Sequence, residues 1–336
     1  SNLPLRAGSR GYNANGIRSY KSPSENDIRG HWDMLRTYLN SLDSVLEELK
    51  PIAERVARDN TVIVMTCNFG QSELLMNFVC AAESRGFDLG NVLVFSTDKE
   101  TKELAEGLGL ATYYDERNFE HIPTKEAGRY GDRAFVAMMY AKVVCVQLIN
   151  MLGYDLLFQD VDVVWYQNPL PWFKADIQKK ELEGKNGGNG GVVGNAGHPW
   201  DMYFQDDGAH TVRYAPYSAN SGFYYVRSNE RTRYLFASLL YHGDLIRTTD
   251  SHQQTLIALL NEHASLFGLR VKILNRDTPE FPGGWHYHKK NKQFMKSILT
   301  GEVTPYIFHM SWTTNKNNKL KFFQQMGEWR VKDTCV

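Results

Sequence analysis

Short apolar runs alternate with segments of helical periodicity through the first half of the chain. Residues 62–65, 92–95 and 156–158 are continuous apolar runs of strand length, which is typical of strands that are buried on both faces. Apolar side chains recur at helical spacing over 31–58 and 133–152, and this periodicity predicts helices. Strands alternating with helices indicate an α/β fold, in which helices cover both faces of a mostly parallel sheet.

The pattern differs at the start of the chain and in its middle. Residues 1–30 have almost no apolar periodicity, which predicts a flexible arm or stem. The Gly-rich segment 184–197 predicts a flexible loop. We therefore expect a single catalytic domain over 31–336, with a regular half over 31–172 and a less regular half over 173–336.

Composition restricts the classes of partner. Lys and Arg together number 38, as do Asp and Glu, so the formal net charge is +0. No bulk electric field therefore favours nucleic acid or anionic lipid, and we expect no nucleic-acid partner. We find no segment long and apolar enough to span a bilayer. Contact with a membrane is expected only through an anchor outside this sequence.

The four cysteines do not suggest a metal-binding motif. Cys67, Cys80, Cys145 and Cys335 form no CxxC pair, which argues against a zinc finger. Three of them lie in apolar runs, where a buried free thiol is expected, although a disulfide remains open. The sequence contains no Asn-x-Ser/Thr site, which argues slightly against a glycosylated secretory protein.

The segment that most strongly indicates a functional site is 158–162, where an apolar run ends in two acids. Side chains alternate along a strand, so Asp160 and Asp162 are predicted to point to the same side. Two carboxylates so close to an apolar strand repel each other and resist desolvation, and a divalent cation relieves both effects. Hard oxygen ligands suit Mg²⁺ or Mn²⁺, which also bridge phosphate oxygens. The alternative is a strand end with two solvated acids.

Further motifs occur in a defined order around this acid pair. They are Tyr140-Ala141-Lys142, residues 153–158, residues 160–165, Asn168-Pro169, residues 220–228, residues 250–254, residues 281–284 and residues 309–312. As an ordered set, over roughly 61–335, they resemble glycosyltransferase family 77. The resemblance implies a GT-A-type nucleotide-diphospho-sugar transferase fold, with a Rossmann-like sheet, and a retaining transferase activity.

The resemblance also implies a metal site. Asp160 and Asp162 are similar to the DxD pair of these enzymes, in which Asp162 would bind the metal directly and Asp160 would reach the metal and the ribose. His309 follows an apolar run and is similar to the C-terminal histidine that completes the metal shell in related retaining enzymes. A histidine in this position, taken alone, is more often structural.

On the donor-sugar side, Asn220 and Gln253 match positions that line the sugar in distant retaining relatives. An amide is a poor nucleophile, so a displacement on one face of the sugar suits these residues better than a covalent intermediate. Both amides would stabilise the positive charge that develops on the sugar. His252 stands where a distant relative has an acid, so either Asp250 or Asp207 is expected to supply that carboxylate.

Basic and polar side chains are predicted to hold the nucleotide and its diphosphate. Lys142 matches a basic residue that faces the donor, and Lys316 and Lys319 lie where an ammonium group would neutralise the leaving diphosphate. The nucleotide is expected at the ends of the first two strands, with four candidate residues: Thr66, Asn68, Gly70 and Asp98. Surface lysines and plain helix caps are the alternatives. Residues 281–288 predict either an aromatic wall for a sugar or a packed loop.

The function implied by the resemblance is transfer of galactose, xylose or arabinose from a UDP-sugar to a hydroxyl of a glycan or glycoprotein, with Mn²⁺ or Mg²⁺. The expected compartment is the Golgi lumen, reached through a type II membrane anchor, with the cytoplasm as the alternative. Two other functions stay open. A haloacid-dehalogenase-type phosphatase would use Asp160 as its nucleophile, and a non-catalytic relative would only bind nucleotide sugars.

Overall fold

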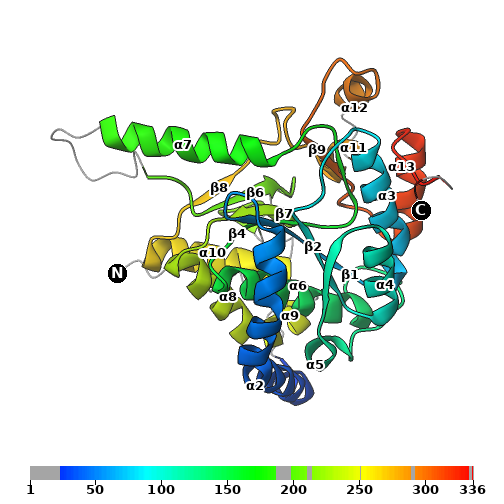
Figure 1. Cartoon of the computed structure of the whole chain (residues 1–336). Helices are drawn as coiled ribbons and strands as arrows, with labels where there is room; N and C mark the ends of the chain where they lie inside the picture. The colour runs from blue at the N-terminus through cyan, green and yellow to red at the C-terminus, as the bar shows by residue number, and fades with distance from the viewer. Residues whose placement is uncertain are drawn as a thin grey trace.

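A mixed sheet forms the centre of the molecule (Figure 1). The computed structural model describes residues 23–186, 198–209, 214–249, 251–288, 292–332 and 335. A seven-stranded sheet has the order β3-β2-β1-β4-β7-β6-β8, and a two-stranded sheet pairs β5 with β9. The strands are β1 (Thr61–Cys67), β2 (Val92–Ser96), β3 (Ala111–Tyr114), β4 (Asp155–Gln159), β5 (Val163–Trp165), β6 (Met202–Asp206), β7 (Ala219–Val226), β8 (Val271–Ile273) and β9 (Ile307–His309).

Most pairs in the large sheet are parallel, as predicted. β1 pairs in parallel with both β2 and β4, β2 with β3, and β6 with β8. β7 is antiparallel to both β4 and β6. The carboxyl ends of β1, β2 and β4 therefore lie along one edge, which is where ligands of open α/β sheets bind.

The continuous apolar runs are explained by helices on both faces of this sheet. Val62 and Val64 of β1 belong to a core shared with the helices on one face, whereas Ile63 and Met65 belong to the core on the other face. Since side chains alternate along a strand, both sets must be apolar. The α/β fold predicted from the sequence is confirmed.

Two groups of helices cover the two faces. One core includes residues of α2, α6, α8, α9 and α10, and the other includes residues of α3, α4, α7, α12 and α13. The helices, including the short 3-10 helix η1, are α2 (Glu25–Val56), η1 (Phe69–Gln71), α3 (Ser72–Glu83), α4 (Lys99–Gly107), α5 (Glu116–Phe119), α6 (Arg133–Met151), α7 (Leu170–Asn186), α8 (Glu230–Tyr241), α9 (Gly243–Thr249), α10 (His252–Phe267), α11 (Gly284–His288), α12 (Lys292–Leu299) and α13 (Lys316–Gln325).

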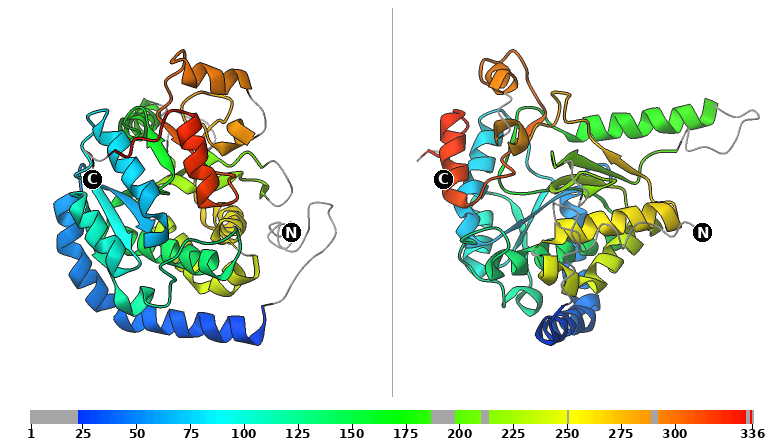
Figure 2. Two further views of the ribbon diagram at one scale, coloured as in Figure 1. Left: turned by 90° about the vertical axis from the view of Figure 1, so that its right-hand side faces the viewer. Right: turned by 180° about the vertical axis from the view of Figure 1, so that it is seen from behind.

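The first helix starts earlier than predicted. A capping box between Ser24 and Asp27 starts α2 at Glu25, because the two side chains satisfy backbone donors of the first turn. The predicted flexible arm is therefore wrong for residues 25–30, and residues 1–22 lie outside the described part. α2 continues through Pro51, and Figure 2 shows it as two straight stretches with a bend between them, as a proline inside a helix requires.

The predicted flexible loop over 184–197 is also wrong in part, because a helix extends into it. Residues 184–186 of the predicted Gly-rich loop belong to α7, and residues 187–197 lie outside the described part of the chain. α7 extends away from the body of the molecule (Figure 1). After the first turn of α7, about half of its residues are charged. Its apolar periodicity is therefore too weak to predict a helix.

One helix corrects the expectation that no segment is apolar enough to span a bilayer. Within the described residues, α6 passes that test by length and composition, and 72% of its apolar window is buried inside the protein. It packs against β1 and β4 under the centre of the sheet. Its apolar character is thus accounted for by its place in the core.

The cysteines are only partly as predicted. Cys67 and Cys145 are free and buried, as expected. Cys80 of α3 is not free, because it forms a disulfide with Cys335, with the two Cα atoms 5.8 Å apart. This bond and the ion pair of Arg85 with Glu328, at 2.7 Å, fasten the C-terminal segment to α3.

We expect loss of this disulfide to destabilise the fold. The bond closes a loop across a sequence separation of 255, and restricting so long a loop in the unfolded chain stabilises the native state by about 2–4 kcal/mol. Urea unfolding of Cys80→Ser should show that loss of stability. Cys335→Ser should show the same loss, and the double variant should be no less stable than either single variant. Equal stability of the unaltered protein with and without reductant would contradict the prediction.

Candidate active site

The two acids lie at the carboxyl end of β4, in the sheet edge described above. β4 ends at Gln159, so Asp160 and Asp162 belong to the turn before β5. The reason given from the sequence, alternation along a strand, is therefore wrong, but the two carboxylates still converge. His309 at the end of β9 joins them because β9 pairs with β5, placing His309 opposite Val163.

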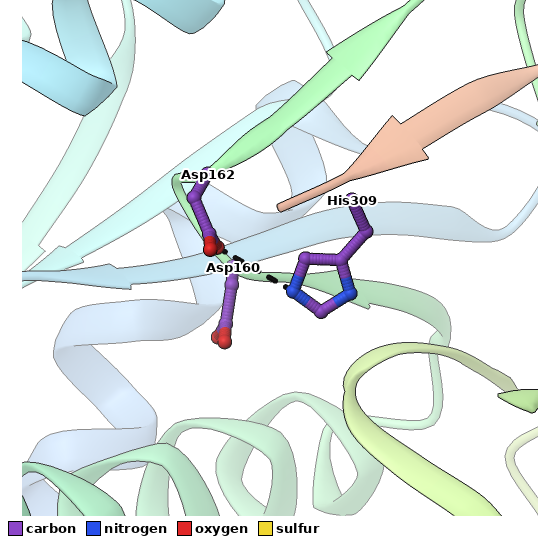
Figure 3. Close-up of side chains that lie close together, drawn as sticks. All are labelled: Asp160, Asp162 and His309. Atoms are coloured by element: carbon purple, nitrogen blue, oxygen red, sulfur yellow. Dashed lines mark ion pairs between the residues drawn. The ribbon is translucent and has the colours of Figure 1, made fainter. Parts of the chain in front are cut away.

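These three residues form one compact group (Figure 3). One ligand atom from each of Asp160, Asp162 and His309 lies within 4.8 Å of the others. Among the described residues, this is the one group of acidic, histidine and cysteine side chains that meets this distance. The expected metal ligands are thus brought together by two segments that are distant in the sequence: the turn between β4 and β5, and the end of β9.

Basic side chains lie against Asp162, the buried member of the acid pair. Lys319 Nζ lies 2.6 Å from Asp162 Oδ2, and His309 Nε2 lies 3.5 Å from Asp162 Oδ1. Burial by itself raises the pKa of Asp162, but the ammonium charge of Lys319, together with the neighbouring His309, outweighs it and holds this pKa below its usual range. The Asp162 side chain is therefore an anion at neutral pH, as a ligand for a cation must be.

The lysines predicted from the sequence have different positions. Lys142 of α6 is buried, and its Nζ lies 2.5 Å from Asp160 Oδ1. Lys319 contacts the second acid, as described. Lys316 instead pairs with Glu73 of α3, at 2.9 Å. The sequence did not decide between Lys316 and Lys319. Of the two, Lys319 is the one whose ammonium group lies beside the acid pair.

The space among the ligands exists because Gly222 has no side chain. A Cβ atom added there would lie 2.6 Å from His309 Cε1, 2.7 Å from Asp160 Oδ2 and 3.0 Å from His309 Nε2. These are closer than carbon and oxygen atoms pack, so any larger residue would displace a ligand. Two carboxylates and an imidazole nitrogen around such a space fit a divalent cation.

A second polar cluster includes Asn220 and Ser221, which directly precede Gly222 in β7. Asp207 Oδ1 accepts hydrogen bonds from Asn220 Nδ2, at 2.9 Å, and from Gln253 Nε2, at 3.2 Å. Gln253 Oε1 in turn accepts from the backbone N–H of Ser221, at 2.9 Å. The structure therefore brings together both amides that the sequence predicted, and it adds Asp207 to them. Asp250 lies outside the described residues.

Asp207 has the properties of a functional carboxylate. Burial raises its pKa to about 6, although the hydrogen bonds from Gln253 and Asn220 oppose that rise. Its backbone oxygen accepts a hydrogen bond from the indole of Trp312, at 2.6 Å. Trp312 has a left-handed backbone with φ 61, which is unfavourable for a bulky residue and is found most often at functional sites.

The candidates at the ends of β1 and β2 are strongly engaged by the fold. Asn68 donates from Nδ2 to the backbone oxygens of Pro123 and Lys125, at 2.9 and 3.0 Å. A Cβ on Gly70 would lie 2.0 Å from the backbone nitrogen of Glu126, so glycine permits this close approach. These contacts hold the loop after α5 over the end of β1, where Thr66 is also buried.

Asp98 acts as a helix cap in the structure. One of its oxygens accepts from the backbone N–H of Thr101 at the start of α4, and the other accepts from the N–H of Phe69. These contacts support the alternative that Asp98 is a structural helix cap. A contact of Thr66, Asn68, Gly70 or Asp98 with a nucleotide remains a prediction.

The aromatic segment 281–288 is largely packed. His286 is buried, and its Nε2 lies 2.7 Å from the backbone oxygen of Arg276. The Tyr287 ring packs on Phe322, with the ring centroids 4.6 Å apart. Trp285 packs against Gly208, next to Asp207. The packed-loop alternative describes most of this segment, and Trp285 is the member that lies near the polar cluster.

The fold and this site together define an α/β nucleotide-sugar transferase with an acid pair at the carboxyl end of a central strand. The family profile of nucleotide-diphospho-sugar transferases matches residues 88–323. The chain belongs to this family, which confirms the resemblance inferred from its motifs. It also removes the alternative of a phosphatase in which Asp160 is the nucleophile.

Several characterised relatives are glycosyltransferases. The chain is 22% identical over 310 residues to the UDP-galactose:fucoside alpha-3-galactosyltransferase of Dictyostelium discoideum, covering 82% of this chain and 44% of that protein. It is 24% identical over 301 residues to the β-arabinofuranosyltransferase RAY1 of Arabidopsis thaliana, covering 84% of this chain and 50% of that protein. The chain thus spans about half the length of the curated relatives that it matches.

Among solved structures, a galactosyltransferase LgtC in complex with donor and acceptor sugar analogues is similar over 81% of this chain and 98% of that chain. The TM-score is 0.44 at 12% sequence identity.

Proposed function

We propose that this chain is a retaining, metal-dependent glycosyltransferase that moves a sugar from a UDP-sugar to a hydroxyl of a glycan or glycoprotein. The observation that carries the proposal is the convergence of Asp160, Asp162 and His309 within 4.8 Å at the sheet edge where nucleotide ligands of α/β folds bind. Membership of the nucleotide-diphospho-sugar transferase family supports the type of donor.

Asp160, Asp162 and His309 would hold the cation. Carboxylates suit Mg²⁺ and Mn²⁺ equally, and the imidazole of His309 favours Mn²⁺, the transition metal of the two. When bound, the cation neutralises the diphosphate that leaves from the sugar. The ammonium group of Lys319, which contacts Asp162, would pair with the same diphosphate.

The residues on the sugar side stabilise positive charge. The cluster of Asp207, Asn220 and Gln253 offers one carboxylate and two amides to a sugar ring that becomes oxocarbenium-like as the diphosphate leaves. The acceptor hydroxyl then attacks on the face from which the diphosphate departs and gives its proton to an oxygen of that departing diphosphate, so that configuration is retained. Neither amide acts as a nucleophile in this sequence of events.

Calorimetry tests the donor and metal parts of the proposal. UDP titrated into the protein should bind with Mn²⁺ present and bind far more weakly in EDTA. A screen of UDP-galactose, UDP-xylose and UDP-arabinose for metal-dependent hydrolysis then identifies the sugar, and NMR of the transfer product gives the anomeric configuration. Equal UDP affinity in both buffers would contradict the metal dependence, and binding without hydrolysis or transfer would favour the non-catalytic alternative.

The compartment that we propose is the Golgi lumen, with a type II membrane anchor outside this sequence. The disulfide between Cys80 and Cys335 supports an oxidising compartment. Expression of the full-length protein with a fluorescent tag, together with protease protection of isolated membranes, tests this placement. A cytoplasmic protein with reduced Cys80 would contradict it.

We expect Asp207→Asn to change the pH dependence of both turnover and stability. The pKa of Asp207 is raised to about 6, so turnover of the unaltered protein should fall as pH falls through about 6, because the carboxylate that stabilises the sugar cation becomes protonated. The variant should have low turnover at every pH, without the fall in turnover at about pH 6. Its neighbour Asp206→Asn is the matched control and should keep the profile of the unaltered protein.

The stability effect has the opposite sign. The pKa of Asp207 is higher in the folded chain than in the unfolded one, so folding favours the protonated form, and that stabilisation is lost as pH rises through about 6. Asp207→Asn should therefore melt at a higher temperature than the unaltered protein at pH 7.5, and the difference should shrink at pH 5. A pH-independent difference in melting temperature would refute the titration of Asp207.

A further inference from the structure

His309 is oriented by a side chain that no sequence motif indicated. Its Nδ1 lies 2.7 Å from Oε1 of Gln205, a buried residue of β6. Its other nitrogen, Nε2, faces Asp162 Oδ1 at 3.5 Å (Figure 3). One ring nitrogen is thus directed towards the acid pair, and the other is held by a neutral amide.

The contacts of Gln205 determine which way round its amide lies. Gln205 Nε2 donates to the backbone oxygens of Phe281 and Pro282, at 3.0 and 2.9 Å. A carbonyl oxygen cannot donate, so the amide NH₂ group must face these two oxygens and Oε1 must face His309. Since Oε1 only accepts, the proton of the neutral imidazole must be on Nδ1.

We propose that Gln205 is a positioning residue that holds His309 in its Nδ1–H tautomer, so that the lone pair of Nε2 is directed at a cation bound by Asp160 and Asp162. The inference deepens the proposed function and rests on its metal-binding part. A hydrogen bond to the ring nitrogen that does not bind the metal orients a histidine ligand, and removing it typically lowers metal affinity by roughly 10–100-fold.

The same strand also leads to the sugar side of the site. Two residues after Gln205, the backbone oxygen of Asp207 accepts from the Trp312 indole, three residues after His309. Two hydrogen bonds therefore join these two parts of the chain, one between Gln205 of β6 and His309 of β9, and one between the backbone oxygen of Asp207 and the indole of Trp312, just after the two strands. Gln205 thus sets the ring of His309, while Trp312 holds the backbone of Asp207.

Three variants separate the acceptor role of Gln205 from its packing. Gln205→Met keeps the volume but removes the acceptor and both donors. Gln205→Glu keeps an oxygen that accepts from Nδ1. Gln167→Met is the matched control, because Gln167 Nε2 also donates to two backbone oxygens, those of Thr304 and Pro305, at the start of the segment that leads to β9 and without contact to a metal ligand.

Two measurements are made, and neither depends on catalysis. Mn²⁺ affinity is obtained by electron paramagnetic resonance of the free ion, with UDP present. The tautomer of His309 is obtained by NMR of metal-free protein labelled with ¹⁵N-histidine, with the signals assigned by their loss in His309→Ala. Circular dichroism and melting temperature establish that each variant is folded.

We expect Gln205→Met to bind Mn²⁺ roughly 10–100-fold more weakly and to populate the Nε2–H tautomer. Gln205→Glu should keep the Nδ1–H tautomer and bind Mn²⁺ within a few-fold of the unaltered protein, as should Gln167→Met. Unchanged Mn²⁺ affinity in folded Gln205→Met would overturn the proposal, and so would an Nε2–H tautomer in the unaltered protein. Failure of the unaltered protein to bind Mn²⁺ would instead sink the proposed function, and the NMR result would still report on Gln205.

Discussion

Replacing Asp162 by asparagine is expected to abolish metal-dependent UDP binding and to reduce sugar transfer by roughly a thousandfold or more. Asp162 is almost fully buried, with 1% of its surface exposed, and it lies within contact of His309 and Lys319. Asparagine preserves the shape of the side chain but removes the negative charge that attracts a cation. Calorimetry with UDP and Mn²⁺, together with a radiolabelled-sugar transfer assay, measures both losses.

The fold of this variant needs its own control, because the change leaves the Lys319 ammonium group without its partner. An uncompensated buried charge destabilises a protein by about 3–5 kcal/mol, and the loss should be smaller here because the Lys319 side chain is 23% exposed. The double variant Asp162→Asn/Lys319→Met removes both charges and should recover much of that stability while remaining inactive. Asp88→Asn, in an exposed turn, should leave both binding and transfer unchanged. Metal-dependent transfer by folded Asp162→Asn would refute the assignment of the ligand.

The fold was predictable because its signals are local. Each of β1, β2 and β4 is a continuous apolar run, and the two faces of β1 meet two different cores. Such a run needs no knowledge of distant residues to be recognised. α7 shows the limit of this reasoning, since Phe173 and Ile177 are buried but the rest of the helix is mainly polar and extends from the body. A helix that buries so few side chains leaves a weak periodicity.

The acid pair was predictable from its residues, but the rest of the site was not. Asp160 and Asp162 are two positions apart in the sequence, so their mutual repulsion can be inferred directly. His309 was found only through the family resemblance, because its proximity depends on the pairing of β9 with β5. Gln205 lies in no motif, and its role follows from contacts with His309 and two backbone oxygens that fold from distant segments.

The cysteines and the sugar side show the same physical limit. Burial of Cys67 and Cys145 follows from the apolar runs around them, but the partner of Cys80 lies 255 residues away, and no local pattern specifies it. Asp207 was one of two acids that the sequence left open. Its hydrogen bonds with Asn220 and Gln253 support that role for Asp207, and only the folded chain reveals them.

We expect a single methyl group at Gly222 to disable the metal site. The added Cβ of Gly222→Ala would lie 2.6 Å from His309 Cε1 and 2.7 Å from Asp160 Oδ2. The backbone cannot easily move away, because Gly222 O accepts from the Asp160 N–H and Gly222 N donates to Asn220 Oδ1. Either His309 or Asp160 must therefore shift, and a displacement near 1 Å costs about a hundredfold in rate.

The expected result is a loss of roughly a hundredfold or more in transfer, with weaker Mn²⁺ binding. Overpacking should also lower the free energy of unfolding by about 1–3 kcal/mol, so the assays are run well below the melting temperature. Gly107→Ala is the matched control, since a Cβ there meets no atom within 4 Å, and it should retain full Mn²⁺ affinity and transfer. If Gly222→Ala bound Mn²⁺ as tightly as Gly107→Ala does, the cation could not lie among Asp160, Asp162 and His309, because the methyl group must displace His309 or Asp160 from its position in that group.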